Sequence, residues 1–372
     1  MISLDKLVEI GFTLPQATDI SAFFQNVGYL ANITSSDVVS GFTIPANKHF
    51  VIASMSDLKN AIKSDTVFYQ DLYEILAQNG NTKPNQGRVN EIHVYAYSTE
   101  NEATISDGFD EFFALNANWA QLVIDSRVSA DIVAIAGKCE ANDRLFTAQS
   151  TTASTVASSL SSYANTKILN HIATESLAGA LVGEMAQAML GSNGDLYSNF
   201  VGVTPQNYAS TDISAMDSAN VAYYDTVNGI NGGGVSQYGR AILYGNKQAN
   251  GEITKRRYIR FALDKLLKVK CIDFLAKKLT YQESSNNILE GMLKEVLIGA
   301  QSNDLIVKDS EDTNGFYIKC MPIAEIRKSY PTDYSNQVYR ANGWYIDALT
   351  GTKVIIDLFV DPSDAEKTAI EL

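Results

Sequence analysis

The sequence predicts an α/β fold, α+β overall, with a mostly parallel sheet domain followed by a C-terminal helix pair and an antiparallel β region. Three observations support this. Strand-like and helix-like patterns alternate four times between residues 89 and 190. Two long helical patterns follow at residues 254–279 and 284–300. Short strand patterns then dominate the chain after residue 305.

The first half of the chain carries the alternation that predicts the sheet. Its strand patterns are rich in β-branched and aromatic residues, and its helix patterns place apolar residues three and four positions apart. The expected strands are residues 27–33, 49–53, 89–98, 121–125, 145–149 and 168–172. The expected helices are residues 67–78, 105–119, 130–140, 156–163 and 177–190. Successive strand–helix pairs favour parallel strands joined by helical crossovers.

The second half adds two strands, the helix pair and a β region. The strands at residues 219–225 and 241–244 flank a glycine-rich turn. After the helices, the expected strands are residues 305–308, 316–322, 337–341, 344–349 and 353–360. The turn at residues 349–352 would join the last two strands as a hairpin.

Both ends of the chain carry apolar segments that are typical of strands pairing with another chain. In the C-terminal segment one face is formed by Val354, Ile356, Leu358 and Val360. The N-terminal segment contains Ile2, Leu4, Val8 and Ile10. Because a terminal strand presents an open edge of backbone N–H and C=O groups, we expect both segments to act as arms between subunits. The expected division is an N-terminal arm at 1–20, an α/β domain at 21–200, a C-terminal α+β core at 201–352 and a C-terminal arm at 353–372.

Composition limits the classes of function. The chain has 372 residues, a net charge of -13 and 19% charged residues. The acidic balance argues against direct nucleic-acid binding, which requires clustered Lys and Arg. Three dispersed cysteines predict a reducing compartment, the cytoplasm, and no apolar run is long enough for membrane insertion.

Motifs for catalysis or cofactor binding are weak. The spacing from Gly234 to Gly239 matches the start of a phosphate-binding loop, but Arg240 and Ala241 stand where Lys and Ser or Thr are required. His171 and Glu175 are four residues apart without a third ligand nearby, which favours a structural role. We therefore expect no enzyme, cofactor or metal site. A nucleotide-dependent enzyme built on the α/β sheet remains the alternative, as does another self-assembling tube or shell protein.

One basic segment stands out within the acidic chain. Residues 247–278 hold ten Lys or Arg and three acids, a balance of 10 − 3 = +7. The residues chosen as a candidate contact surface are Lys255, Arg256, Arg257 and Arg260. They form either a solvated helix face or a surface that meets an acidic partner.

The order of these segments resembles the contractile tail sheath proteins of bacteriophages and related injection systems, in the branch with a compact, undecorated subunit. The resemblance covers most of the chain and rests on order, not on one sharp motif. Its segments are residues 50–58, 68–78, 119–124, 166–172, 177–189, 219–224, the helix pair at 254–300 and the closing hairpin.

The resemblance implies a structural protein of the virion tail, assembled in the host cytoplasm. Such subunits form a homo-oligomer of stacked hexameric rings around a tail tube protein and meet baseplate and tail terminator proteins. Arms at both chain ends add strands to neighbouring subunits. Contraction without nucleotide would drive the tube through the target envelope for genome ejection.

Overall fold

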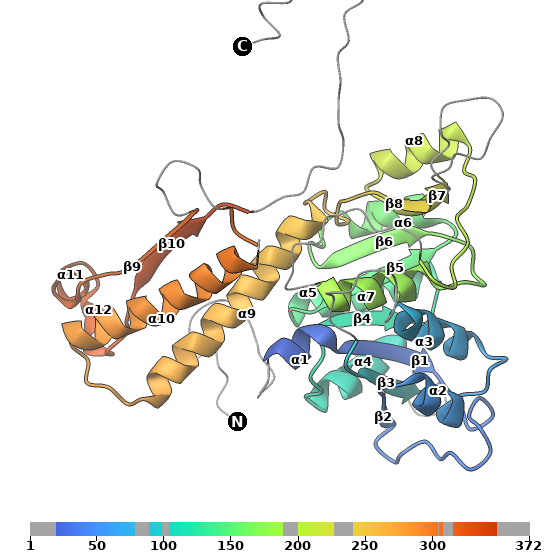
Figure 1. The fold of residues 1–372 in the computed structure, drawn as a ribbon, viewed down its shortest axis with the longest axis horizontal. Helices are drawn as coiled ribbons and strands as arrows, with labels where there is room; N and C mark the ends of the chain where they lie inside the picture. Colours follow the sequence, from blue (N-terminus) through green and yellow to red (C-terminus); the bar gives the residue numbers. More distant parts are fainter. Residues whose placement is uncertain are drawn as a thin grey trace, which may run out of the picture.

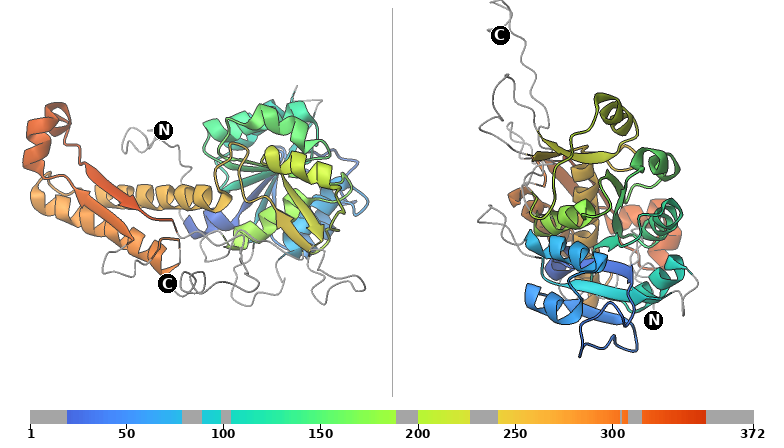
Figure 2. Two further views of the ribbon diagram at one scale, coloured as in Figure 1. Left: turned by 90° about the horizontal axis from the view of Figure 1, so that it is seen from above. Right: turned by 90° about the vertical axis from the view of Figure 1, so that its right-hand side faces the viewer.

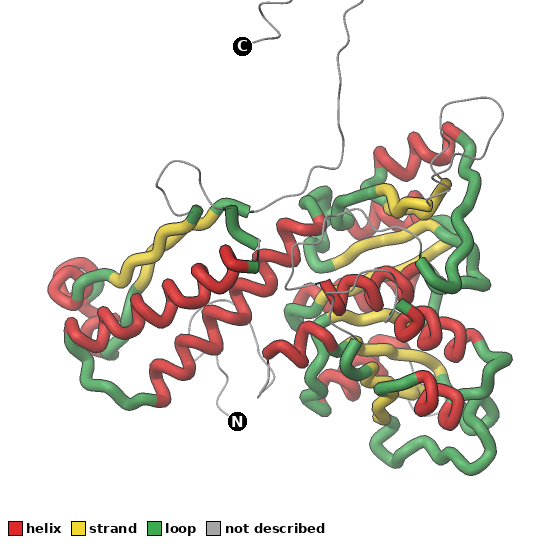
Figure 3. The backbone as a smooth tube through the Cα atoms, in the orientation of Figure 1, coloured by secondary structure: helices red, strands yellow, loops and turns green. Residues whose placement is uncertain are grey.

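The protein consists of an α/β domain and an elongated arm, residues 254–347, that projects from it (Figures 1 and 2). The computed structural model describes residues 20–78, 89–98, 104–188, 200–226, 241–303, 305–307 and 315–347. Strands gather in the domain and, separately, along the arm (Figure 3). No helix among these described residues is long and apolar enough to cross a membrane.

An eight-stranded sheet in the order β2-β3-β1-β4-β5-β6-β7-β8 forms the centre of the domain. The strands are β1 (Val27–Asn32), β2 (His49–Ile52), β3 (Ile92–Tyr97), β4 (Gln121–Ile124), β5 (Leu145–Ser150), β6 (Thr166–Asn170), β7 (Ala222–Thr226) and β8 (Ala241–Tyr244). The strands β3 to β7 are parallel, and only the edge strands β2 and β8 run antiparallel to their neighbours. The prediction of a mostly parallel sheet is confirmed.

Two hydrophobic cores cover the two faces of this sheet. Because successive strand residues point to opposite faces, Tyr29 and its neighbour Leu30 belong to different cores. The first core includes helices α1 (Ile20–Gln25), α2 (Met55–Ala61), α3 (Val67–Ala77) and α7 (Leu177–Ala188). The second core includes α4 (Ile105–Ala114), α5 (Ser129–Ala141), α6 (Ala153–Leu160) and α8 (Ser210–Ser218). The result is a three-layer α/β/α sandwich.

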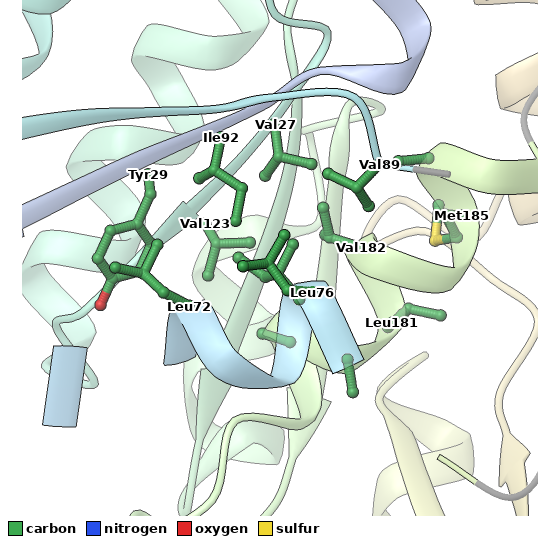
Figure 4. Packing of buried hydrophobic residues seen from close by; sticks show 14 of the residues in the cluster. Val27, Tyr29, Leu72, Leu76, Val89, Ile92, Val123, Leu181, Val182 and Met185 are labelled. Atoms are coloured by element: carbon green, nitrogen blue, oxygen red, sulfur yellow. The ribbon is translucent and has the colours of Figure 1, made fainter. Parts of the chain in front are cut away.

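Helix α7 approaches α3 very closely because glycines lie between them. A Cβ atom at Gly179 would be 2.9 Å from the carbonyl oxygen of Asp71, and one at Gly183 would overlap the carbonyl of Ile75. Leu72 and Leu76 of α3 therefore reach the sheet beside the side chains of α7 (Figure 4).

The arm contains the expected helix pair and antiparallel β region. Its elements are α9 (Thr254–Ala276), α10 (Glu283–Ser302), β9 (Phe316–Cys320), α11 (Ile323–Ser329), α12 (Pro331–Ser335) and β10 (Ala341–Tyr345). Strand β10 pairs antiparallel with β9. A third hydrophobic core joins α9, α10 and β9.

Several local expectations were wrong. Two strands expected at 337–341 and 344–349 are replaced by the single strand β10. Pro331 starts the short helix α12 instead, and Gln337, with φ 58°, ends the turn that follows it. Residues 305–307 make only an isolated bridge, between Ile306 and Asp347. Helices α1, α2, α8, α11 and α12 had not been expected, because five to nine residues give too little periodicity to recognise.

The sheet does not end at the expected domain boundary near residue 200. Strands β7 and β8 continue it to Tyr244, and α9 starts at Thr254. We propose that the division between the α/β domain and the arm lies within residues 245–254.

Candidate assembly arm

Helix α9 joins the arm to the domain because its side chains belong to two cores. Tyr258 and Phe261 lie in the first core of the domain, where the Phe261 ring lies 6.3 Å from that of Phe23. Ile259 and Leu263 lie in the core of the arm. At 1.5 Å per residue, α9 is about 34 Å long, so its far half extends beyond the sheet (Figure 1).

A buried lysine ties the start of α9 to the sheet. The Nζ atom of Lys167 on β6 donates to the carbonyl oxygen of Gly245 at 2.7 Å and to the hydroxyl of Thr254 at 3.0 Å. Lys167 is 1% exposed, so these bonds replace the water that its ammonium group loses on burial. The segment that leads into α9 is thereby fixed against the end of the domain.

Two further polar ties connect α9 to the loops next to β5 and β6. The guanidinium of Arg257 donates twice to Oδ1 of Asn165, at 2.9 and 2.6 Å. Lys265, fully buried, forms an ion pair with Asp143. Burial lowers the pKa of Lys265, and the carboxylate of Asp143 opposes that shift. Domain and arm are therefore held together by packing and by directed bonds.

The four basic residues expected to form a contact surface do not form one free stripe. Lys255 is buried, and Arg257 is bonded to the domain. Arg256 donates to Asp347 at 2.7 Å, and Arg260 donates to Glu252 at 2.7 Å. The side chains of Arg256 and Arg260 are 44% and 54% exposed, so only these two face outward. Acidic residues of the same chain therefore pair with Arg256 and Arg260 and offset part of the local positive charge.

Other exposed basic residues lie at the distal end of the arm. Lys277 and Lys278 follow the last turn of α9, and Arg327 and Lys328 lie in the last turn of α11. Sequence reasoning missed Arg327 and Lys328 because α11 was not expected. The guanidinium of Arg327 lies 5.6 Å from the centre of the Tyr334 ring, and its side chain stays exposed.

The two-stranded sheet of the arm has one covered face and one open face. Phe316, Ile318 and Cys320 of β9 pack into the core of the arm. On the opposite face, Tyr317 and Trp344 stack at 6.3 Å and are 46% and 52% exposed. Among the described residues β9 and β10 pair only with each other, so each keeps one edge that no described strand covers.

The N-terminal and C-terminal segments that were predicted to join subunits lie outside the described residues. The C-terminal residues concerned are Val354, Ile356, Leu358 and Val360, and the N-terminal residues are Ile2, Leu4, Val8 and Ile10. The glycine-rich segment 227–240 is also outside them. Strand donation therefore stays a prediction.

Within the described part of the chain, no group of three His, Cys, Asp or Glu could hold a metal ion. The His171–Glu175 pair forms hydrogen bonds within the fold. Nε2 of His171 lies 3.0 Å from Oε2 of Glu175, and Glu175 also accepts from the backbone N–H of Thr204 at 2.7 Å. Burial lowers the pKa of His171. The pair anchors the segment after residue 200 to the start of α7.

Comparison with known proteins assigns the fold. No family model and no curated protein sequence matches the chain. Among solved structures, a chain of the anti-feeding prophage (AFP) baseplate aligns with a TM-score of 0.66 and 9% identity, covering 91% of this chain and 94% of that chain. A chain of the AFP helical sheath in its contracted state aligns with a TM-score of 0.61 and 11% identity, covering 90% and 92%. The chain thus has the fold of contractile sheath proteins, which confirms the expected resemblance at the level of the fold. A sheath tail protein from Listeria innocua also aligns, with a TM-score of 0.49 and 10% identity, over 81% and 92%.

Proposed function

We propose that the protein is a structural subunit of a contractile tail sheath. The observation that carries this proposal is the likeness to AFP baseplate and sheath chains over nine-tenths of both partners. The subunits would assemble as a homo-oligomer of stacked rings of six around an inner tube and contract to drive that tube through an envelope. The assembly would form in the host cytoplasm and act as part of a phage or phage-derived tail.

The arm supplies a place where neighbouring subunits can join. The outer edges of β9 and β10, which no described strand covers, offer backbone N–H and C=O groups to an added strand, except at Cys320, whose N–H donates to Glu290 at 3.0 Å. The alternating segment 353–360 has the pattern of such a strand, and the N-terminal segment is the second candidate. Backbone pairing would keep the subunits connected while each of them rotates.

The bonds between arm and domain suit a subunit that moves as one body. The core shared through α9, the Lys265–Asp143 pair and the Arg257–Asn165 bonds all oppose motion at the junction. Contraction would then change contacts between subunits and leave the fold of each one unchanged. We propose that the free energy comes from larger contacts in the contracted lattice, so that no nucleotide is used.

Charge suits a contact between the distal end of the arm and an acidic tube. Lys277, Lys278, Arg327 and Lys328 are exposed there, whereas Lys255 and Arg257 are occupied within the subunit. We therefore place the proposed tube contact at the distal end. Baseplate and terminator proteins would bind the two ends of the stack.

Negative-stain electron microscopy of the full chain, alone and with a purified candidate tube protein, tests the proposal. We expect hollow striated tubes of uniform width. A chain lacking residues 353–372 should remain folded by circular dichroism and remain monomeric. Tubes formed by that truncated chain would exclude donation of the C-terminal strand. Full-length protein that stays monodisperse and does not bind the tube would count against the sheath proposal.

A further inference from the structure

Two histidines connect the edge strand β2 to the rest of the large sheet. Strand β2 pairs only with β3 among the described strands, in a register that places His49 opposite Tyr95 and Val51 opposite His93. His49 and His93 therefore lie diagonally on the same face. Their rings are nearly parallel, with centroids 5.3 Å apart and an interplanar angle of 8°. Nε2 of His49 lies 3.1 Å from Nδ1 of His93, which is the distance of one hydrogen bond.

Neighbouring amides determine where the protons of this pair reside. Nδ2 of Asn26 donates to the backbone oxygen of Asn118 at 2.7 Å, and Oδ1 of Asn26 accepts from Asn90 at 3.1 Å. These two bonds fix the orientation of the Asn26 amide, whose Nδ2 lies 3.3 Å from Nε2 of His93. Nε2 of His93 must accept there, so its proton is on Nδ1 and donates to Nε2 of His49.

The surroundings favour the neutral form of both rings. Burial lowers the pKa of His93 to about 4, with the charge of His49 as a second cause, and burial also lowers the pKa of His49. The groups packed around the pair are the Phe112 ring from α4, 6.0 Å from His49, and Tyr95 from β3. The charged groups are Glu91, whose Oε2 lies 3.5 Å from Nε2 of His93, and Lys48, next to His49 in sequence.

We propose that the His49–His93 pair is an acid-operated catch that holds the edge strand β2 on the sheet. One added proton puts an N–H on Nε2 of His93. Because the orientation of the Asn26 amide is fixed, its Nδ2 can no longer donate to that atom, and this hydrogen bond is lost. Among the described contacts, Glu91 is the only acid near Nε2. A second added proton places two imidazolium groups at hydrogen-bonding distance, where they repel each other. Strand β2 then detaches and leaves the edge of β3 open to another strand. This device lies in the α/β domain and is independent of the proposed sheath function.

Peptide-resolved hydrogen exchange on the full chain tests the catch. The exchange of residues 49–52 and 92–95 would be followed from about pH 7 to about pH 4 and corrected for the intrinsic rate at each pH. We expect protection of both segments to fall at least about tenfold on acidification, while β4 and β5 stay protected. In His49→Gln, whose Oε1 can accept from His93 without gaining charge, this loss should disappear. The matched control His171→Gln removes the third histidine, outside the pair, and should retain the loss.

Two results would overturn the proposal. One is wild-type protection of β2 that persists at about pH 4, and the other is an equal loss in His49→Gln. Nitrogen chemical shifts of the histidine rings in the wild-type protein give a test that needs no variant. At neutral pH we expect both rings to carry their proton on Nδ1, and a His93 protonated on Nε2 would refute the hydrogen-bond chain.

Discussion

At the scale of single residues, a buried polar network fastens helix α3 to the sheet and to α7. The hydroxyl of Tyr29 donates to Oδ2 of Asp71 at 2.8 Å, and Arg127 donates to Oδ1 of the same carboxylate at 3.0 Å. One turn further along α3, Glu74 accepts the backbone N–H of Ser176 at the start of α7. Such groups stabilise a fold only while their hydrogen bonds are complete, because each has lost its water.

The carboxyl group of Glu74 should make stability depend on pH. Burial raises the pKa of Glu74 to about 8, above its value in the unfolded chain. The contribution of the Glu74 carboxyl group to the free energy of unfolding is therefore fully present below about pH 4.5. It is lost as the pH rises through about 8. We expect Glu74→Gln to be more stable than the wild type by about 2 kcal/mol at about pH 9, with little gain below about pH 5. Urea unfolding across this range measures the difference. The control is Asp110→Asn, which removes an exposed carboxylate paired with Lys138 and should change stability by less than about 1 kcal/mol. A Glu74→Gln protein that loses stability at every pH would contradict the prediction.

The close approach of α7 to α3 can be tested at one glycine. Gly183→Ala places a methyl group against the carbonyl of Ile75, so α7 must shift, and we expect a loss of about 2–4 kcal/mol in the free energy of unfolding. Gly291→Ala is the matched control, because a Cβ at Gly291 in α10 would meet no atom within 4 Å apart from its chain neighbours and the backbone of its own helix. That change should stabilise the protein by about 0.5–1 kcal/mol through helix propensity. Equal effects of the two changes would mean that the helices are not in close contact.

At the scale of elements, α9 determines how the arm is held. This helix of 23 residues buries side chains on two sides, and some of them are charged. Each buried charge needs a partner of opposite charge or hydrogen bonds that replace its water. Lys265 meets Asp143, and Arg144 next to it lies among aromatic rings, with its guanidinium 5.0 Å from the centre of the Trp119 ring. Burial lowers the pKa of Arg144 to about 10. These contacts join α9, β5 and the second core of the domain at one point.

Removing one partner of the Lys265–Asp143 pair should be worse than removing both. Lys265→Met leaves a buried carboxylate without a partner, and we expect a loss of about 3–5 kcal/mol. The double variant Lys265→Met with Asp143→Asn should recover most of that loss. Lys270→Met, which breaks an exposed pair with Glu295, is the control and should change stability by less than about 1 kcal/mol. Chemical denaturation of the wild type, the single variants Lys265→Met and Asp143→Asn, and the double variant gives the coupling energy. Additive effects of the two substitutions would show that the pair is not coupled.

At the scale of the whole molecule, charge is divided unequally between the arm and the rest. Residues 254–347 hold 15 Lys or Arg and 12 Asp or Glu, a balance of 15 − 12 = +3. The remaining residues hold 14 Lys or Arg and 30 Asp or Glu, a balance of 14 − 30 = −16. Together with +3 this gives the net charge of -13. An arm of the opposite sign to the body favours contact with acidic surfaces, including those of other subunits.

Charge reversal should separate contact residues from residues that hold the fold. Arg327→Glu with Lys328→Glu should leave the melting temperature nearly unchanged and weaken the proposed assembly on the tube at least about tenfold, because both side chains are exposed at the distal end. Arg257→Glu should instead destabilise the subunit, since it breaks the bonds to Asn165. Co-sedimentation with tubes and thermal unfolding measure the two effects. Lys59→Glu, an exposed change on α2 of the α/β domain, is the control. Normal tube binding by the Arg327 and Lys328 variant would place the contact elsewhere.

The sequence by itself determined the elements whose periodicity is long or strongly apolar. It placed β1, the alternation from β3 to α7, and the long helices α9 and α10, because spacing along one segment is a local property. It left open whether the basic residues of α9 form a solvated face or a surface that meets an acidic partner.

Only the tertiary structure decided how these elements are combined. It placed β1 between β3 and β4, continued the sheet through β7 and β8, and brought Lys265 to Asp143 across 122 positions of the chain. It also made α11 a second source of exposed basic residues. The physical reason is that strand order and the pairing of buried charges depend on contacts between segments far apart in the chain, for which no local pattern exists.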